Sequence, residues 1–78
     1  MTQLEKAIER LRARPAEARL EDVGRVLVGH GYQEVRQRGS HLTFVHPQRR
    51  RFTLPLTHGK TIKRVYIIEL LEELHLDG

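Results

Sequence analysis

Residues 32–54 of the chain, YQEVRQRGSHLTFVHPQRRRFTL, decide the fold. Two short turns, Gly39-Ser40 and Pro47-Gln48-Arg49, divide this stretch into three segments in which apolar and polar side chains alternate. Alternation with a period of two is typical of strands with one buried face, and short turns between strands favour an antiparallel meander. We therefore predict strands at about 32–38, 41–46 and 50–54.

Two stretches with helical periodicity flank these strands. Apolar side chains three and four residues apart predict a helix over about 18–29. A similar stripe predicts a final helix over about 62–75, and Thr61 is the expected N-cap of that helix. The residues of the two stripes are Leu20, Val23, Val26 and Leu27 in the first helix, and Val65, Ile68, Leu71 and Leu74 in the last.

A further helix is predicted at the start of the chain, over about 3–13. Thr2-Gln3-Leu4-Glu5 has the pattern of a capping box, in which the threonine side chain accepts from a helical amide and the glutamate reaches back. Pro15 ends this helix, because the residue before a proline avoids the helical conformation. The helix is expected to be an extension of the domain.

Together these elements predict one α+β domain over 1–78, with an N-terminal helical extension at 1–14 and a core at 18–76. The core has the order αβββα, with two helices packed on one face of a three-stranded antiparallel sheet. Successive strand residues point to opposite faces, and the opposite register would bury arginines at a high energetic cost. The predicted inner face holds Val35, Leu42, Phe44, Phe52 and Leu54, and the predicted open face holds Arg36, Arg38, His41, Thr43, Arg51 and Thr53.

Basic residues are concentrated in the middle of the chain. The net charge is +4, yet residues 36–64 hold eight of the 14 Lys and Arg side chains and no Asp or Glu. A basic stretch of this kind is typical of proteins that bind a polyanion, although uneven surface charge is the simpler alternative. The chain has no cysteine, which excludes disulfides, thiolate metal ligands and a cysteine nucleophile.

Other classes of protein are disfavoured by simple patterns. The first residues are charged and the apolar runs are short, so we expect neither a secretion signal nor a membrane span. A small domain without disulfides suits the reducing cytoplasm, which is the expected location. The histidines are scattered and have no carboxylates at ligand spacing, so we expect no metal and no other cofactor.

Several motifs follow one another within residues 29–60, and they are Gly31-Tyr32, Arg36-Gln37-Arg38-Gly39-Ser40-His41, Phe44, Pro55 and His58-Gly59-Lys60. In this order and spacing, they resemble the HicA family of RNA-cleaving toxins. The resemblance implies a fold like that of double-stranded-RNA-binding domains and a metal-independent ribonuclease that degrades mRNA, with the catalytic histidine of the family at His41. It also implies an antitoxin partner of the HicB type, and a free toxin that is monomeric or weakly dimeric.

The chain departs from the family pattern at a few positions. The loop at His58-Gly59-Lys60 is one residue shorter than the family form, and Val65-Tyr66 stands where the family has a small residue. The N-terminal helix also precedes the usual start of the family. These departures affect the expected contacts of the final helix and the expected binding of the partner, and they affect the catalytic assignment of His41 less.

The residue types also suit RNA cleavage when they are considered without the resemblance. The 2′-OH of RNA can attack the adjacent phosphate, so a protein must move protons and stabilise charge on phosphorus. Histidine titrates near neutrality, and guanidinium groups bind phosphate oxygens in bidentate fashion. The predicted site has His41 for proton transfer and, for RNA binding, Arg36, Arg38, Gly39, Ser40, Arg51, His58, Lys60, Lys63 and Arg64.

Four members of the predicted site have a further rationale, and two other functions remain open. Lys60, Lys63 and Arg64 are expected to cluster at the N-terminus of the last helix, where backbone amides attract anions. His58 is a second candidate for proton transfer. A non-catalytic RNA-binding module would use the same basic face, and a small interaction protein would use the segregated charges to bind a partner chain. Only the Gly-Ser-His context favours cleavage over these alternatives.

Overall fold

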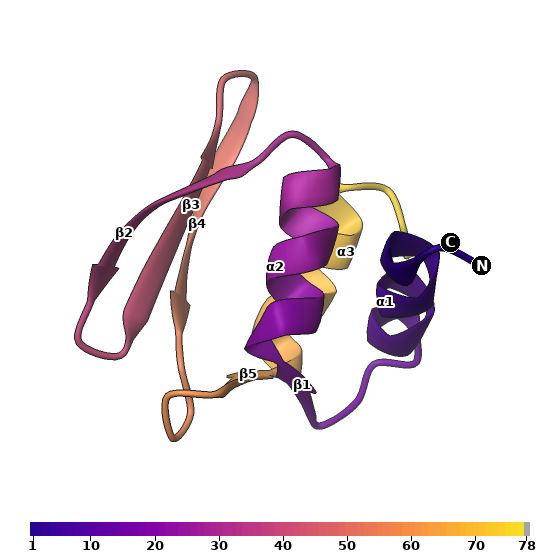
Figure 1. Ribbon diagram of the computed structural model, residues 1–78, viewed down its shortest axis with the longest axis horizontal. Helices are drawn as coiled ribbons and strands as arrows, with labels where there is room; N and C mark the ends of the chain where they lie inside the picture. Colours follow the sequence, from indigo (N-terminus) through magenta and orange to yellow (C-terminus); the bar gives the residue numbers. More distant parts are fainter. Residues whose placement is uncertain (78) are drawn as a thin grey trace.

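The computed structural model describes residues 1–77 and arranges them in three layers (Figure 1). A three-stranded antiparallel sheet forms one layer, two helices cover one of its faces, and the first helix lies on the far side of those two helices. The predicted α+β fold, with the order αβββα of double-stranded-RNA-binding domains and an extra N-terminal helix, is thereby confirmed. The sheet consists of β2 (Gln33–Arg38), β3 (His41–His46) and β4 (Arg49–Pro55), and the helices are α1 (Gln3–Arg12), α2 (Leu20–Gly29) and α3 (Arg64–Glu73).

The hydrophobic core lies between the sheet and the layer formed by α2 and α3. Leu42 and Phe44 of β3 stand opposite Leu54 and Phe52 of β4, and each of these four side chains is 1% exposed. Their burial removes a large apolar area from water, which is the main favourable contribution to folding. The inner face predicted for β3 and β4 is therefore confirmed.

Strand β2 departs from the predicted alternation at Val35. This side chain was predicted to face the helices, but it is 52% exposed. Glu34 pairs with Phe44 and Arg36 pairs with Thr43, so Val35 is an extra residue that forms a β-bulge. The bulge moves Val35 out of the core and keeps the arginines of β2 on the face that points away from the helices.

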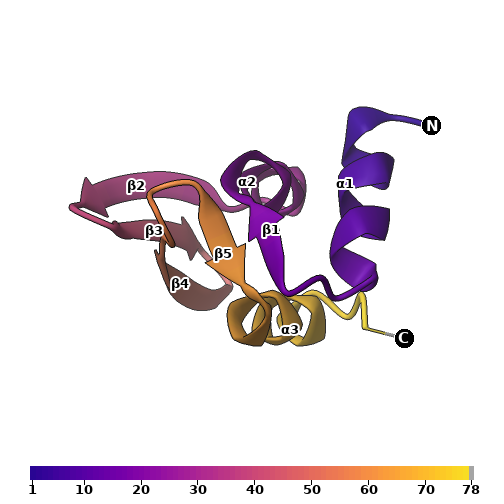
Figure 2. The same cartoon turned by 90° about the horizontal axis from the view of Figure 1, so that it is seen from below.

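A second sheet, made of two short strands, takes the place of the first residues of the helices predicted over 18–29 and 62–75. Strand β1 (Glu17–Arg19) pairs antiparallel with β5 (Thr61–Lys63), and Figure 2 shows the two side by side. Thr61 is therefore not a helix cap, contrary to the prediction. Its hydroxyl group donates a hydrogen bond to the Glu17 carboxylate, while Lys63 occupies the N-cap position of α3 without a side-chain bond.

The buried side of α3 also differs from the prediction. Val65 is 57% exposed and Ile68 is only half-buried, because α3 begins at Arg64 and presents a different stripe to the core. Apolar residues are nearly continuous along this helix, so the sequence permits more than one buried face. The residues of α3 and its C-terminal end that belong to the core are Ile67, Leu70, Leu71 and Leu74.

Helix α1 contributes two fully buried side chains to the hydrophobic core. Ala7 and Leu11 have no exposed surface, and the predicted capping box forms at the N-terminus of the helix. Arg10 donates hydrogen bonds of 3.0 and 2.9 Å to the carboxylate of Asp22 in α2. This side-chain hydrogen bond raises the pKa of Arg10. Helix α1 is thus held by apolar burial and by a bidentate ion pair.

Replacing Leu11 by alanine is expected to lower the free energy of unfolding by about 2–5 kcal/mol, because it leaves a cavity in the core. Urea denaturation followed by circular dichroism measures this loss. Val65→Ala is the matched control, because Val65 is 57% exposed and its truncation should change stability by less than about 0.5 kcal/mol. A Leu11→Ala chain as stable as the Val65→Ala chain would show that α1 adds nothing to the core.

Candidate nucleic-acid interface

The sheet face that points away from the helices, here called the open basic face, carries exposed arginines from two strands. Arg36 and Arg38 belong to β2 and Arg51 belongs to β4, and all three are exposed. Arg38 stands opposite His41 and Arg36 stands opposite Thr43. Side chains in directly opposed positions lie roughly 5 Å apart at their Cβ atoms. The cross-strand register therefore brings the predicted histidine and the two arginines of β2 together.

His41 is the first residue of β3 and stands between Arg38 of β2 and Pro55 of β4. Its side chain is exposed, and within residues 1–77 no other side chain bonds to the imidazole. By contrast, the Nδ1 atom of His30 lies 2.7 Å from a backbone carbonyl of α2, and the Nδ1 atom of His46 accepts a hydrogen bond from a backbone amide. His41 thus has both ring nitrogens available for a bound molecule, whereas His30 and His46 serve the fold.

The turn before His41 depends on the backbone conformation of Gly39. Its φ of +55° lies in the left-handed region, which glycine adopts without strain. A Cβ atom at this position would meet nothing within 4 Å. The preference for glycine here therefore comes from the backbone conformation and not from steric crowding. The Ser40 carbonyl accepts a hydrogen bond of 2.6 Å from the Leu56 amide, which ties the turn to the end of β4.

The loop between β4 and β5 carries the second group of predicted site residues. Thr57 pairs with Thr61, and the Lys60 amide donates a hydrogen bond of 3.1 Å to the Thr57 carbonyl. His58 and Gly59 therefore form the tip of the loop, and both have a positive φ. The Lys60 carbonyl accepts from the first amide of α2 at 2.9 Å, so this loop is anchored to the helix layer. Figure 1 shows the loop at the same end of the sheet as the β2–β3 turn.

Lys63 and Arg64 lie at the start of α3, away from the open basic face. The Nε atom of Arg64 donates to the carbonyls of Arg14 and Pro15 at 2.8 and 3.3 Å, and its amide donates to the Ala16 carbonyl. Arg64 therefore holds the N-terminal linker in place. The predicted residues form two groups, which are Arg36, Arg38, Gly39, Ser40, His41 and Arg51 around the open basic face, and His58, Lys60, Lys63 and Arg64 between β4 and α3.

The three consecutive arginines at 49–51 have different environments. Arg49 donates to the carbonyl of Glu73 at 2.8 Å, and the Arg50 guanidinium lies over the Phe52 ring at 4.5 Å from its centroid. Only Arg51 belongs to the open basic face. Alternation in the sequence placed Arg51 on the open face and Arg49 in a turn, but the contact between Arg49 and Glu73 joins elements that are distant in the chain.

Within residues 1–77, no Phe, Tyr or Trp ring lies on the open basic face. Phe44 and Phe52 belong to the core, and Tyr32 is 3% exposed with its hydroxyl group donating to the Arg50 carbonyl. Burial of the Tyr32 hydroxyl group also raises its pKa. A molecule bound to this face would therefore meet arginines, threonines and the His41 imidazole, and it would find no Phe, Tyr or Trp ring on which to stack.

Residues 1–77 contain no cluster of three or more His, Cys, Asp or Glu side chains arranged to hold a metal ion. Among the helices of the same region, none is both long enough and apolar enough to cross a bilayer.

Comparison with known proteins gives one family match. Residues 20–76 match the model of a family described as "HicA toxin of bacterial toxin-antitoxin". The matched region begins with α2 and extends beyond the end of α3, so it contains the whole three-stranded sheet and both groups of site residues. Searches of curated proteins and of solved structures gave no significant match.

Replacing Gly39 by alanine is expected to lower the free energy of unfolding by about 1 kcal/mol, because a Cβ atom disfavours the left-handed conformation. Gly39→Asn should cost less, since asparagine adopts this conformation more readily. Chemical denaturation of the two variants gives the comparison. An asparagine variant less stable than the alanine variant would show that steric crowding, and not backbone conformation, restricts this position.

Proposed function

The chain belongs to the HicA toxin family, and from this premise we propose that it is an endoribonuclease toxin that cleaves mRNA and is neutralised by a HicB-type antitoxin. The observation that carries the proposal is the position of His41 on the open basic face, opposite Arg38 and beside Arg36. The charge pattern supports it, since residues 36–64 contain no acidic side chain to repel RNA. The proposed substrate is cytoplasmic, in agreement with the location expected from the sequence.

His41 is proposed to transfer protons during cleavage. The 2′-oxygen of a ribose attacks the adjacent phosphorus, and the bond from phosphorus to the 5′-oxygen of the next nucleotide breaks. The proton of the 2′-OH passes to a base, and the leaving 5′-oxygen takes a proton from an acid. A neutral imidazole can act as the base and an imidazolium as the acid, so His41 can serve either step. No metal ion or cofactor takes part in this scheme.

Arg36 and Arg38 are proposed to bind the phosphate at which cleavage occurs. Their guanidinium groups can donate paired hydrogen bonds to the non-bridging oxygens, whose charge grows as the 2′-oxygen attacks. Arg38 stands opposite His41 across the strands, so a phosphate bound there lies beside the imidazole. The exposed turn at Gly39 and Ser40 allows the RNA backbone to approach this pair.

The remaining predicted residues are proposed to bind more distant phosphates. Arg51 extends the open basic face along β4, and the group between β4 and α3 lies around the end of the sheet. Because the open basic face has no Phe, Tyr or Trp ring on which bases could stack, affinity should come mainly from phosphate contacts and should depend strongly on salt. Such contacts discriminate little between base sequences, so a broad range of mRNA sequences is the expected substrate class.

One observation favours a second candidate function, a non-catalytic RNA-binding module. Within residues 1–77 no group orients the His41 imidazole, whereas catalytic bases in many enzymes have such a partner. Under this alternative, the open basic face binds RNA through the same arginines and leaves it intact. Cleavage assays with purified protein separate the two functions.

Replacing His41 by alanine is expected to slow RNA cleavage by about 10²- to 10⁴-fold, the usual contribution of general acid–base catalysis. Single-turnover cleavage of an end-labelled RNA measures the rate, with EDTA present and absent. His75→Ala is the control, because His75 is exposed beyond α3 and far from β3 in the chain. A wild-type rate no higher than that of His41→Ala would leave only RNA binding, and loss of cleavage in EDTA would contradict the metal-free scheme.

Replacing Arg38 by alanine is expected to weaken RNA binding and to reduce the slope of log Kobs against log salt concentration by about 1, as expected for one lost phosphate contact. Fluorescence anisotropy at several salt concentrations gives this slope. Lys6→Ala removes the same charge from the exposed side of α1 and should leave the slope nearly unchanged. Equal effects of the two substitutions would indicate that only net charge matters.

A further inference from the structure

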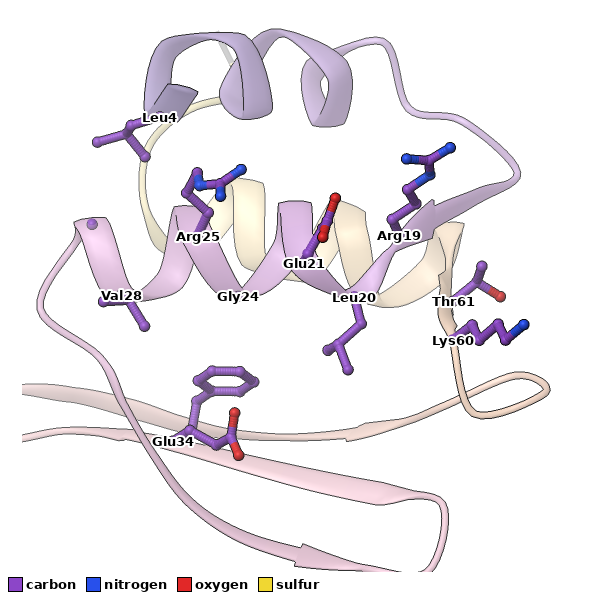
Figure 3. A pocket seen from close by; sticks show the side chains of 12 residues that line it. Leu4, Arg19, Leu20, Glu21, Gly24, Arg25, Val28, Glu34, Lys60 and Thr61 are labelled. Carbon is purple, nitrogen blue, oxygen red and sulfur yellow. The ribbon is translucent and has the colours of Figure 1, made fainter. Parts of the chain in front are cut away.

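A groove of about 1030 Å³ lies between α2 and the inner side of β2 and β3. Figure 3 shows Leu20 and Val28 pointing from α2 toward the strands, and Glu34 rising from β2 on the opposite wall. Leu4 of α1 lies near one end of the groove and Lys60 lies at the other. The groove is therefore on the helix side of the sheet, separate from the open basic face.

The apolar lining of this groove is incompletely covered by the chain itself. Val28 is 57% exposed, although it stands on the side of α2 that points to the strands. Gly24 lies in the middle of α2, and a Cβ atom there would meet only the tip of the Phe44 ring at 3.8 Å, an ordinary contact distance. Neither crowding nor a positive φ requires glycine here. The missing side chain weakens the helix and leaves the groove deeper.

Three basic and two acidic side chains line the groove. Arg19, Arg25 and Lys60 contribute to its lining, and none of them forms an ion pair within residues 1–77. The two acidic residues are Glu21, which interacts electrostatically with Arg10 of α1, and Glu34 on the β2 wall, so the basic side chains exceed the acidic ones by one. A partner with apolar side chains and neighbouring carboxylates would match both the lining and the charges.

We infer that this groove binds a segment of the antitoxin in which apolar side chains are flanked by acidic ones. The inference rests on the proposed function, because that function requires an antitoxin. Lys60 connects the groove to the loop assigned to RNA phosphates. An antitoxin carboxylate on Lys60 would displace a phosphate from it, so a partner bound on the helix side can compete with RNA.

A pair of matched substitutions tests the groove. Val28→Glu places a charge in the apolar lining, and Val65→Glu places the same charge on α3 at a position that is also 57% exposed. Titration calorimetry with the purified protein encoded by the adjacent gene gives the affinity of each chain. Val28→Glu is expected to weaken binding at least about tenfold, whereas Val65→Glu should stay within about threefold of the wild type.

A second variant fills the groove without adding charge. Gly24→Leu introduces a good helix former whose Cβ atom meets no backbone, so the variant should melt at a temperature no lower than that of the wild type. Its side chain would occupy space in the groove, and antitoxin affinity should again fall at least about tenfold. A stable Gly24→Leu chain with wild-type affinity would overturn the inference.

The outcomes also separate this inference from the proposed function. Wild-type affinity in Val28→Glu, or a larger loss in Val65→Glu, would show that the antitoxin docks elsewhere, whatever the cleavage assays give. If the wild-type chain fails to cleave RNA and Val28→Glu still loses the antitoxin, the groove assignment stands and the ribonuclease assignment fails. Absence of binding between the adjacent gene product and the wild-type chain would overturn the groove assignment.

Discussion

The burial of one face of β3 and β4 against α2 and α3 determines where the charged groups of this toxin lie. A strand places successive side chains on opposite faces, so the residues between buried ones must point away from the helices. Phe44 and Phe52 occupy the inner face. Thr43 and Thr53, which directly adjoin them in the strands and pair with each other, occupy the outer face. Charged side chains such as Arg51 are costly to bury, which reinforces the same choice of faces. The open basic face thus follows directly from the packing of the core.

Much of this arrangement can be predicted from the sequence, because it depends on patterns that are local. The strand boundaries follow from two turns, and the inner faces of β3 and β4 follow from simple alternation. The position of His41 beside Arg38 then needs only a tight turn at Gly39-Ser40 and an antiparallel pair. These features are strong because local preference and tertiary packing agree.

The features that could not be predicted depend on contacts between distant parts of the chain. The bulge at Val35 exists because β2 pairs with β3 in a shifted register, which no period in β2 itself reveals. Strands β1 and β5 have three residues each, too few for periodicity, and they form only because they meet each other. The buried side of α3 and the hydrogen bond from Arg49 to Glu73 have the same origin. The N-terminal helix itself follows from its capping box, but its packing on α2 does not, since the ion pair between Arg10 and Asp22 joins residues twelve positions apart.

Strand β2 lies at the edge of its sheet, and this position has a consequence for the solution behaviour of the free toxin. An uncovered edge strand offers unpaired backbone groups to a second copy, which is a common route to aggregation. The bulge at Val35 interrupts the flat edge, and the flanking positive charges of Arg36 and Arg38 would repel their counterparts on another molecule. The same irregular, cationic strand that carries two arginines of the open basic face therefore also disfavours the addition of one molecule to the sheet of the next.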